Sequence, residues 1–475
     1  MTVLVALVVT GALFAWFLRL ESNGPSVVVV AVVFGIVLAE SVIYQSQNTI
    51  PGGLVHPEFH SFSFRLIDIV IPAALLARAL HRTRGRPVNV SILLWGALGV
   101  WLVGAGLLGA YEGNSLKLVG FHGKAIVYLG ALVLTATVPL REYLAPGRLE
   151  RFLTWTSAVA LVFFATDVAG ISVTRHVPLV PLTEFGTMGS DAATIFTSLG
   201  ILAVALALLA DSGRGRLFAI ALPLLVAPAV ADQRAAFIAL AVSLAVVVVV
   251  MTFSRRQVRV TPTSAGLAAL AVTGLLLLPS MGQILTGGEV TLPLQSRLTT
   301  TFTSYEEVLT TQDRLNQWHA ARPLIEQRPI LGWGLGKEYL YYDPGFQTFD
   351  RIDLTHNIFG DLLLRSGLVG LGLFLLALAS TSVALARGWS WRESDRAAAF
   401  ALGAGAIVAG LIGKGMAESI FEKYRLCVVL GLGLGLMISA GLPSEARPPV
   451  RRRVPAQRAP STSEERISPR IPARL

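Results

Sequence analysis

Long apolar segments are the feature that most constrains the fold of this chain. A helix needs about 20 predominantly apolar residues to cross the hydrocarbon core of a bilayer. Only 14% of the 475 residues are charged, against about 25% in a typical soluble domain. The sequence therefore predicts an all-α fold, a polytopic transmembrane helical bundle of about 12–13 spans. The candidate spans lie near residues 2–19, 25–44, 65–80, 89–110, 123–140, 151–173, 191–210, 217–232, 234–252, 264–282, 357–386, 397–416 and 425–441.

The distribution of arginine predicts how these spans are oriented. Short basic connections occur after the odd-numbered spans only, at 81–86, 141–151, 214–216, 255–259 and 387–396. Lys- and Arg-rich loops stay on the cytoplasmic side of a membrane. We therefore expect the N-terminus and the long segment 283–356 on the outer side. That segment carries nine acidic and six basic residues. Acidic loops cross the membrane readily, so its charge agrees with an outer position.

Four regions follow from this topology. We expect an N-terminal transmembrane bundle of about ten spans at 1–282, a long outer loop at 283–356, C-terminal spans at 357–441 and a disordered cytoplasmic tail at 442–475. The last 31 residues hold eight arginines and three glutamates, half of the net charge of +10. Attraction to anionic membrane lipids explains this tail better than nucleic-acid binding.

Ionisable residues inside spans are costly and therefore mark candidate functional sites. In this chain they gather toward the predicted outer ends of the spans, whereas the inner halves are nearly free of charge. Arg19 and Arg78 are exceptions, which we interpret as side chains that snorkel to the interface. This concentration of charge at the outer ends predicts a polar cavity open to the outer leaflet. The alternative is that the charged side chains only anchor the helix ends at the membrane interface. The residues concerned are Glu40, Arg65, Asp68, Asp167, Asp191, Asp232, Arg234, Asp361, Arg365, Lys414 and Glu418.

The outer loop contains one amphipathic helix, predicted over 312–327. Asp313 is a plausible N-cap, and Pro323 is expected to end or kink the helix. Trp318 suits a membrane interface. The glycine-rich stretch 329–337 lacks the spacing of a phosphate-binding loop and predicts a tight turn.

An aromatic run follows that turn, with Tyr339, Tyr341, Tyr342 and Phe346. It is interpreted either as a surface for stacking sugars or as packing of the loop against itself.

His356 and Asn357 then open the eleventh span. Asn357, Asp361 and Arg365 recur every four residues and share one helix face. The helix N-terminus beside His356 disfavours an imidazolium, so a neutral base would be available there.

The sequence resembles the O-antigen ligase and Wzy-type O-antigen polymerase family. The family's ligase signature, His-Asn followed by two spaced glycines, is matched in register by His356, Asn357, Gly367 and Gly370. Upstream, Arg314 precedes a Trp-bearing helix as in the family. Three weaker matches are Pro329 with Gly332 and Gly334, Gln233-Arg234 in place of a Ser-Arg pair, and Phe185-Gly186-Thr187. The sequence departs from the family at Arg365, where family members often carry Glu.

The resemblance implies a metal-independent, inverting glycosyltransferase with a GT-C-like fold in the bacterial plasma membrane. Its donor would be an undecaprenyl-diphosphate-linked glycan, and its acceptor a sugar hydroxyl on another glycan or glycolipid at the outer face. The single cysteine and the scattered histidines contain no metal-ligand spacing, and no cofactor is expected.

Arginines would then bind the leaving diphosphate. We assign Arg234 and Arg314 to it, with Arg65 and Arg322 as weaker candidates. His356 would accept the proton of the attacking hydroxyl. Acceptor-binding or orienting roles are assigned to a further set, of which the carboxylates are alternative bases: Asn357, Asp361, Glu418 and Trp318.

The main alternative function is a flippase or transporter of lipid-linked glycans. Such a protein needs polar residues along a translocation path, and the inner halves of these spans offer few. Ligase and polymerase share the same donor and differ in the acceptor, so the sequence leaves that choice open.

Overall fold

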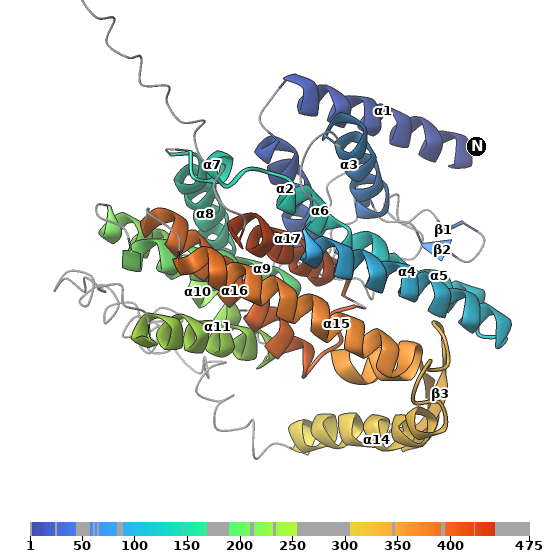
Figure 1. Cartoon of the computed structure of the whole chain (residues 1–475). Coiled ribbons are helices and arrows are strands. Elements are labelled where there is room, and N and C mark those ends of the chain that lie inside the picture. The colour runs from blue at the N-terminus through green and yellow to red at the C-terminus, as the bar shows by residue number, and fades with distance from the viewer. Residues whose placement is uncertain are drawn as a thin grey trace, which may run out of the picture. The chain divides into compact units, whose positions relative to one another are not determined.

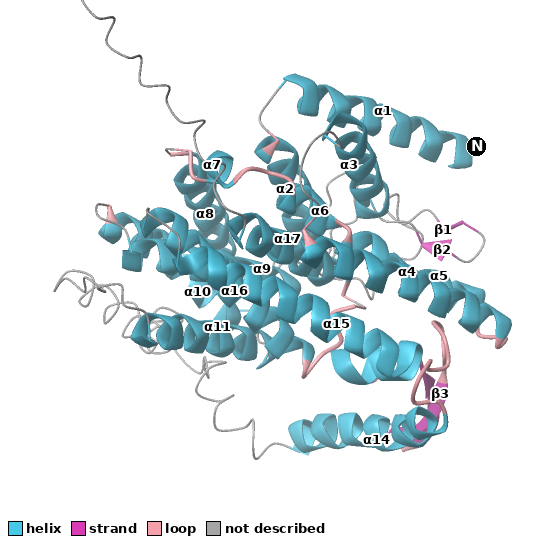
Figure 2. Ribbon diagram, in the orientation of Figure 1, coloured by secondary structure: helices cyan, strands magenta, loops and turns pink. Residues whose placement is uncertain are grey.

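The computed structural model is a bundle of helices with two short hairpins (Figures 1 and 2). It describes residues 2–23, 26–43, 58–59, 62–63, 66–82, 89–145, 147–168, 190–209, 213–230, 234–253, 305–343, 347–390, 395–421 and 423–441. Its helices are α1 (Thr2–Asn23), α2 (Val27–Ile43), α3 (Leu66–Arg82), α4 (Val90–Tyr111), α5 (Leu116–Leu129), α6 (Ala131–Ala136), α7 (Leu140–Tyr143), α8 (Arg148–Val168), α9 (Ser190–Leu209), α10 (Arg214–Val230), α11 (Arg234–Phe253), α14 (Tyr305–Gln327), α15 (Ile358–Ser390), α16 (Asp395–Gly415) and α17 (Tyr424–Gly441). The strands β1 (Glu58–Phe59) and β2 (Phe62–Ser63) pair with each other, as do β3 (Tyr339–Asp343) and β4 (Thr348–Ile352).

Seven segments among the described residues are long and apolar enough to cross a membrane. They match seven of the predicted spans to within a few residues, except that the span predicted at 123–140 is observed at Leu116–Ala136. The prediction of an all-α, multi-pass membrane protein is therefore confirmed. The predicted span at 264–282 and the basic tail lie outside the described residues. The seven segments are Val90–Tyr111, Leu116–Ala136, Asp191–Leu209, Ala235–Phe253, Ile358–Arg387, Asp395–Gly415 and Tyr424–Gly441.

Helices α9, α16 and α17 form the interior of the bundle. More than four fifths of the apolar stretch of each is buried, 89%, 83% and 89% respectively. Small residues let these helices approach their neighbours closely, as is usual between helices in lipid. Gly410 of α16, for example, leaves room for the Ser243 hydroxyl of α11, which donates a 2.9 Å hydrogen bond to the Ala406 carbonyl.

Helix α15 is interrupted, and the break is filled by another segment of the chain. Gly367 has φ +63° and ψ −166°, which no helical residue adopts. The carbonyls of Leu364 and Arg365 accept hydrogen bonds from the N–H groups of Trp333 (2.9 Å) and Gly334 (3.0 Å). Beyond the break, the Leu368 N–H donates to the Pro329 carbonyl at 2.7 Å. The predicted turn at 329–337 is thus a loop inserted into a discontinuous helix, and it satisfies backbone groups that lipid could not.

Helix α14 and the β3–β4 hairpin form a small core of their own beside the first half of α15 (Figure 1). Ala321 of α14, Tyr339 and Tyr341 of β3, and Leu364 of α15 are buried together. The aromatic run is therefore divided. Tyr339 and Tyr341 face this core, whereas Tyr342 is exposed; Phe346 lies outside the described residues.

The predicted N-cap of α14 is wrong, and so is one of the two alternatives given for Pro323. The helix begins at Tyr305, so Asp313 lies within it and is not its N-cap. Instead the Asp313 carboxylate accepts a 2.9 Å hydrogen bond from Gln317, one turn further along. Pro323 does not end the helix, which continues to Gln327.

The interpretation of Arg78 as a snorkelling side chain is also wrong. Its side chain is only 1% exposed and forms a 2.5 Å ion pair with Glu21 of α1. It also donates hydrogen bonds to the Thr137 hydroxyl (2.9 Å) and the Ser26 carbonyl (3.0 Å). The end of α1 and the start of α2 cover this part of α3, so the charge is neutralised inside the protein and does not reach the interface.

Candidate active site

Three segments that are distant in sequence meet around His356. His356 lies two residues before α15, which begins at Ile358. Helix α14 contributes Asp313 and Arg314, and the connection between α16 and α17 contributes Glu418. Of the residues that the sequence predicted at the outer ends of the spans, Asp361, Lys414 and Glu418 are thus brought to this place, whereas Asp68 pairs with Lys124 elsewhere in the bundle.

The turn before α15 is fixed by its own side chains. Asn357 accepts hydrogen bonds from the N–H groups of Phe359 (2.9 Å) and Gly360 (3.2 Å), as a helix N-cap does. Its amide nitrogen donates to the Met416 carbonyl at 3.2 Å, which ties the turn to the end of α16. These contacts use both ends of the Asn357 amide, so they favour its orienting role.

Asp361 supports the same turn from inside the protein. Its Oδ1 accepts hydrogen bonds from the Thr355 N–H (2.9 Å) and hydroxyl (3.0 Å), and its Oδ2 accepts one from the Ser419 hydroxyl. Arg365 lies 3.7 Å from Oδ1. The carboxylate is 1% exposed, so among its predicted roles the geometry favours orienting over contact with a sugar.

His356 itself has a left-handed backbone, with φ +47°. Few residues other than glycine adopt this conformation, and it is often found at functional sites. Burial and the nearby positive charge of Arg314 lower the pKa of the imidazole, although the carboxylates of Glu418, Asp313 and Asp361 oppose the shift. The side chain is therefore a neutral imidazole at neutral pH and can accept a proton.

Glu418 lies between two lysines. Lys414 is fully buried and its Nζ is 3.2 Å from Glu418 Oε2, while Lys423 pairs with Oε1. Burial raises the pKa of the Glu418 carboxyl, but the charges of Lys414 and Lys423 lower it by more, so the net shift is downward. A carboxylate held ionised in this way is a poor proton donor, and its charge acts on His356.

A further ion pair joins α17 to α9. Arg425, the second residue of α17, is 3.7 Å from Asp191 at the start of α9. Lys414 also donates a 2.9 Å hydrogen bond to the Thr194 hydroxyl of α9. The start of α9, the end of α16 and the start of α17 are therefore joined by buried polar contacts close to the His356 turn.

His122 belongs to a polar chain that sequence reasoning missed. Its Nδ1 accepts a 3.0 Å hydrogen bond from the Gly336 N–H, and its Nε2 is 3.1 Å from the Asp353 carboxylate. Arg365 in turn donates to the Asp353 carbonyl. Burial raises the pKa of Asp353, but the contact with His122 and the charge of Arg365 lower it by more. A histidine in the middle of an apolar span was the available signal; Asp353 gave none.

Two predicted residues of α14 have different surroundings. Trp318 packs against the first turn of α15, where a Cβ on Gly360 would lie 3.0 Å from its ring. Arg322 forms an exposed pair with Glu326 at 2.7 Å, one turn along the same helix. The structure thus places Trp318 beside the His356 turn and gives Arg322 no contact with it.

Arg234 is placed by its backbone alone, and Arg65 lies outside the described residues. Arg234 is the first residue of α11. In α16, Gly410 meets Ala239 and Gly413 meets Val242, while Ala406 accepts a hydrogen bond from Ser243. Gly403 of α16 meets Leu202 of α9, and Lys414 bonds to Thr194, so α16 is antiparallel to α9. The short connections from α9 to α10 and from α10 to α11 reverse the chain twice, so α11 is antiparallel to α16 as well. The start of α11 therefore lies at the same end of the bundle as Lys414.

No group of three or more His, Cys, Asp or Glu side chains suited to holding a metal ion occurs among the residues that the structure describes. Comparison with curated protein sequences gave no match. Residues 218–375 match the family model described as O-antigen ligase. This range includes α11, α14, the β3–β4 hairpin, the His356 turn and the broken part of α15. The chain is therefore a multi-pass membrane protein in which residues 218–375 match the O-antigen ligase family model.

Proposed function

We propose that this protein is a metal-independent, inverting glycosyltransferase that takes a glycan from a polyprenyl-diphosphate donor. The observation that carries the proposal is the neutral imidazole of His356, held in a fixed turn with the charge of Arg314 beside it. A base next to a cation suits a reaction that removes a proton from a hydroxyl while a diphosphate leaves.

The proposed reaction is a single displacement at the anomeric carbon of the donor. The oxygen of an acceptor sugar hydroxyl forms a bond to that carbon as the bond from the carbon to the diphosphate oxygen breaks. The hydroxyl proton passes to the neutral imidazole of His356, and the electron pair of the broken bond leaves with the diphosphate. Attack from the opposite side inverts the anomeric configuration.

Arginines would stabilise the departing diphosphate, because a guanidinium offers paired donors to phosphate oxygens. Arg314 is the first candidate, since its charge acts on His356. Arg234 is the second, since α11 begins at the same end of the bundle as Lys414. Arg322 is a weaker candidate than either, because it pairs with Glu326 in the exposed part of α14.

The proposed acceptor is a glycan or glycolipid reached at the outer face of the bacterial plasma membrane. The exposed edge of the β3–β4 hairpin supports a role in acceptor binding, because Tyr342 and Phe349 lie side by side there with ring centroids 5.5 Å apart. Exposed aromatic faces suit the apolar faces of sugar rings. Membrane lipids surround the spans, and ligase and polymerase both remain compatible with this site.

The test is transfer of glycan by the purified protein from a polyprenyl-diphosphate donor in the presence of a chelator. We expect His356→Ala to lower kcat by about 10²–10⁴-fold and Arg314→Ala by about 10²–10³-fold. Arg216→Ala is the matched control, because Arg216 lies in the first turn of α10 and outside the site; it should retain wild-type activity.

Two results would count against the proposal. Full activity of both His356→Ala and Arg314→Ala would remove the assigned base and cation. Activity that vanishes with chelator and returns with a divalent cation would show that arginines do not supply the charge alone.

A further inference from the structure

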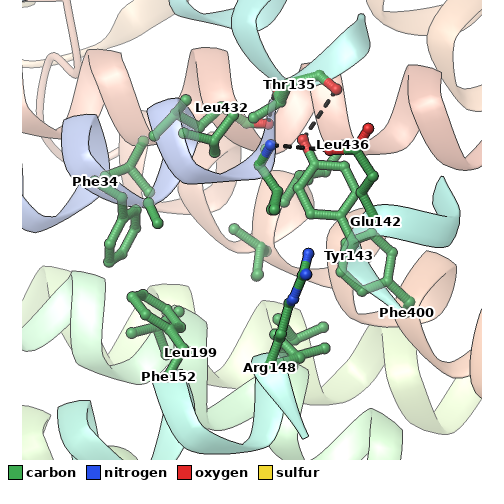
Figure 3. Close-up of a pocket in the computed structure, with 18 of the residues that line it drawn as sticks. Phe34, Thr135, Glu142, Tyr143, Arg148, Phe152, Leu199, Phe400, Leu432 and Leu436 are labelled. Carbon is green, nitrogen blue, oxygen red and sulfur yellow. Dashed lines mark hydrogen bonds between the residues drawn. The ribbon is translucent and has the colours of Figure 1, made fainter. Parts of the chain in front are cut away.

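A largely apolar cavity of about 430 Å³ lies among α2, α8, α9, α16 and α17 (Figure 3). Phe34, Phe152, Leu199 and Leu436 are among its walls. Its volume falls within the range of about 300–1,000 Å³ that is usual for small-molecule sites. Such a volume among membrane helices suits an apolar chain.

The polar end of this cavity lies far from the His356 turn. Helices α16 and α17 both run between the two places. Phe400 of the cavity is 14 residues from Lys414, and Leu436 is 11 residues from Arg425, which corresponds to roughly 21 Å and 16 Å along the helix axes. The polar end of the cavity therefore lies toward the opposite leaflet, while the apolar lining continues along the helices as far as Ile407 and Val429.

Arg148 stands at that end and is the first residue of α8. Its exposed side chain extends over the cavity in Figure 3. Among the described residues, none forms a hydrogen bond or ion pair with the Arg148 guanidinium. The other charged residue of the lining, Glu142, is already engaged, because its carboxylate accepts a 3.2 Å hydrogen bond from the Val27 N–H at the start of α2.

The remaining polar groups of the wall are also occupied within the protein. The Tyr143 hydroxyl donates to the Thr135 carbonyl at 3.1 Å, and the Thr135 hydroxyl donates to the Leu432 carbonyl at 2.9 Å. The Ser198 hydroxyl donates to the Thr194 carbonyl at 2.8 Å. An occupant of the interior would therefore meet apolar surface, with one available cation at the mouth.

We propose that this cavity binds one acyl chain of an anionic phospholipid whose headgroup phosphate pairs with Arg148. An apolar interior with a single cation at the membrane surface complements such a lipid in both its chain and its charge. The diphosphate of the glycan donor must reach His356 at the other end of the bundle, so it is not the group that pairs with Arg148. The Arg148 contact is thus distinct from the proposed transfer site.

Native mass spectrometry of the purified full chain tests this assignment, with phosphatidylglycerol and phosphatidylcholine as competing probes. We expect the wild-type protein to retain one phosphatidylglycerol molecule in preference to phosphatidylcholine. Arg148→Gln should reduce that preference about fivefold. Arg151→Gln is the matched control, because Arg151 lies one turn along α8, outside the lining, and donates to the Gly147 carbonyl at 3.1 Å; it should leave the preference unchanged.

A second variant fills the cavity itself. Ala31 of α2 lines it and is exposed, so Ala31→Trp should displace the retained lipid without disturbing the core. An unchanged melting temperature in detergent is the check on folding, and Val28→Trp replaces it if that check fails. The proposal is overturned if the filled variant keeps the lipid, if Arg148→Gln keeps the wild-type preference, or if a polyprenyl phosphate is the molecule retained.

Discussion

His356 combines a strained backbone with a perturbed side chain. Its φ of +47° costs a residue other than glycine about 1–3 kcal/mol. The hydrogen bonds of Thr355 and Asn357 on either side hold it there. Because burial and Arg314 favour the neutral imidazole, the turn presents a base that is available at neutral pH.

The pH dependence of transfer should therefore follow a lowered histidine pKa. We expect the acid limb of kcat/KM to lie below about pH 6.5, the ordinary value for histidine. Arg314→Gln should move that limb to higher pH, because loss of a positive charge makes protonation of the imidazole easier. Arg314→Lys keeps the charge and should keep the limb near its wild-type position. An acid limb that does not move in Arg314→Gln would show that the charge of Arg314 does not act on His356.

At the scale of elements, the break in α15 is the feature that organises the site. The inserted loop at 329–336 occupies the gap in the helix and also reaches α4 and α5, where the Leu335 N–H donates to the Ala105 carbonyl at 2.9 Å and the Gly336 N–H donates to His122 at 3.0 Å. The loop thus connects the first half of α15 to the transmembrane bundle. A substitution at the break in α15 should therefore also alter the His356 turn, which lies three helical turns away.

Gly367 is the residue on which this arrangement depends. A Cβ there would lie 2.1 Å from the Ile330 carbonyl oxygen, and its φ is +63°. We expect Gly367→Ala to lower the free energy of unfolding by at least about 3 kcal/mol and to expose the loop to protease. Gly372→Ala is the control in the same helix, since nothing lies within 4 Å of its added Cβ. It should change stability by no more than about 1 kcal/mol, in the favourable direction. Equal melting temperatures of the two variants would contradict this account.

At the scale of the whole molecule, two of the polar clusters bear on the orientation of the bundle. One surrounds His356 at the ends of α9, α16 and α17, and the other surrounds Arg78 and Glu21 at the ends of α1 and α3. The apolar cavity extends toward the side that the basic connections predict to be cytoplasmic. The predicted orientation therefore places the cluster around His356 on the outer side and the cluster around Arg78 on the cytoplasmic side.

Labelling of single cysteines tests this orientation. Cys427 is the only cysteine and is buried, so Cys427→Ala gives a suitable background. We expect Phe349→Cys on the hairpin to react with a membrane-impermeant maleimide in intact cells. Arg151→Cys at the start of α8 should react only after the membrane is permeabilised. The reverse pattern would place His356 on the cytoplasmic side and remove the basis for an outer-face acceptor.

Much of the candidate site is predictable from the sequence because its signals are local. The spans follow from runs of apolar residues, and the spacing from His356 to Gly370 is preserved along one stretch of chain. The glycine-rich stretch 329–337 forms turns, as its sequence predicts. Local reasoning was wrong where a helix was longer than its strongest pattern, as at Asp313 in α14.

The sequence by itself determined that this chain is a helical membrane protein with a histidine at the head of one span, since hydropathy and spacing need no knowledge of neighbours. Only the tertiary structure decided what surrounds that histidine. Asp361 faces inward because Thr355 and Ser419 meet it there, and His122 reaches Gly336 across 214 residues of sequence. Such contacts depend on which helices are adjacent. Lipid penalises every unsatisfied polar group alike, so the pairing of particular groups is settled by packing.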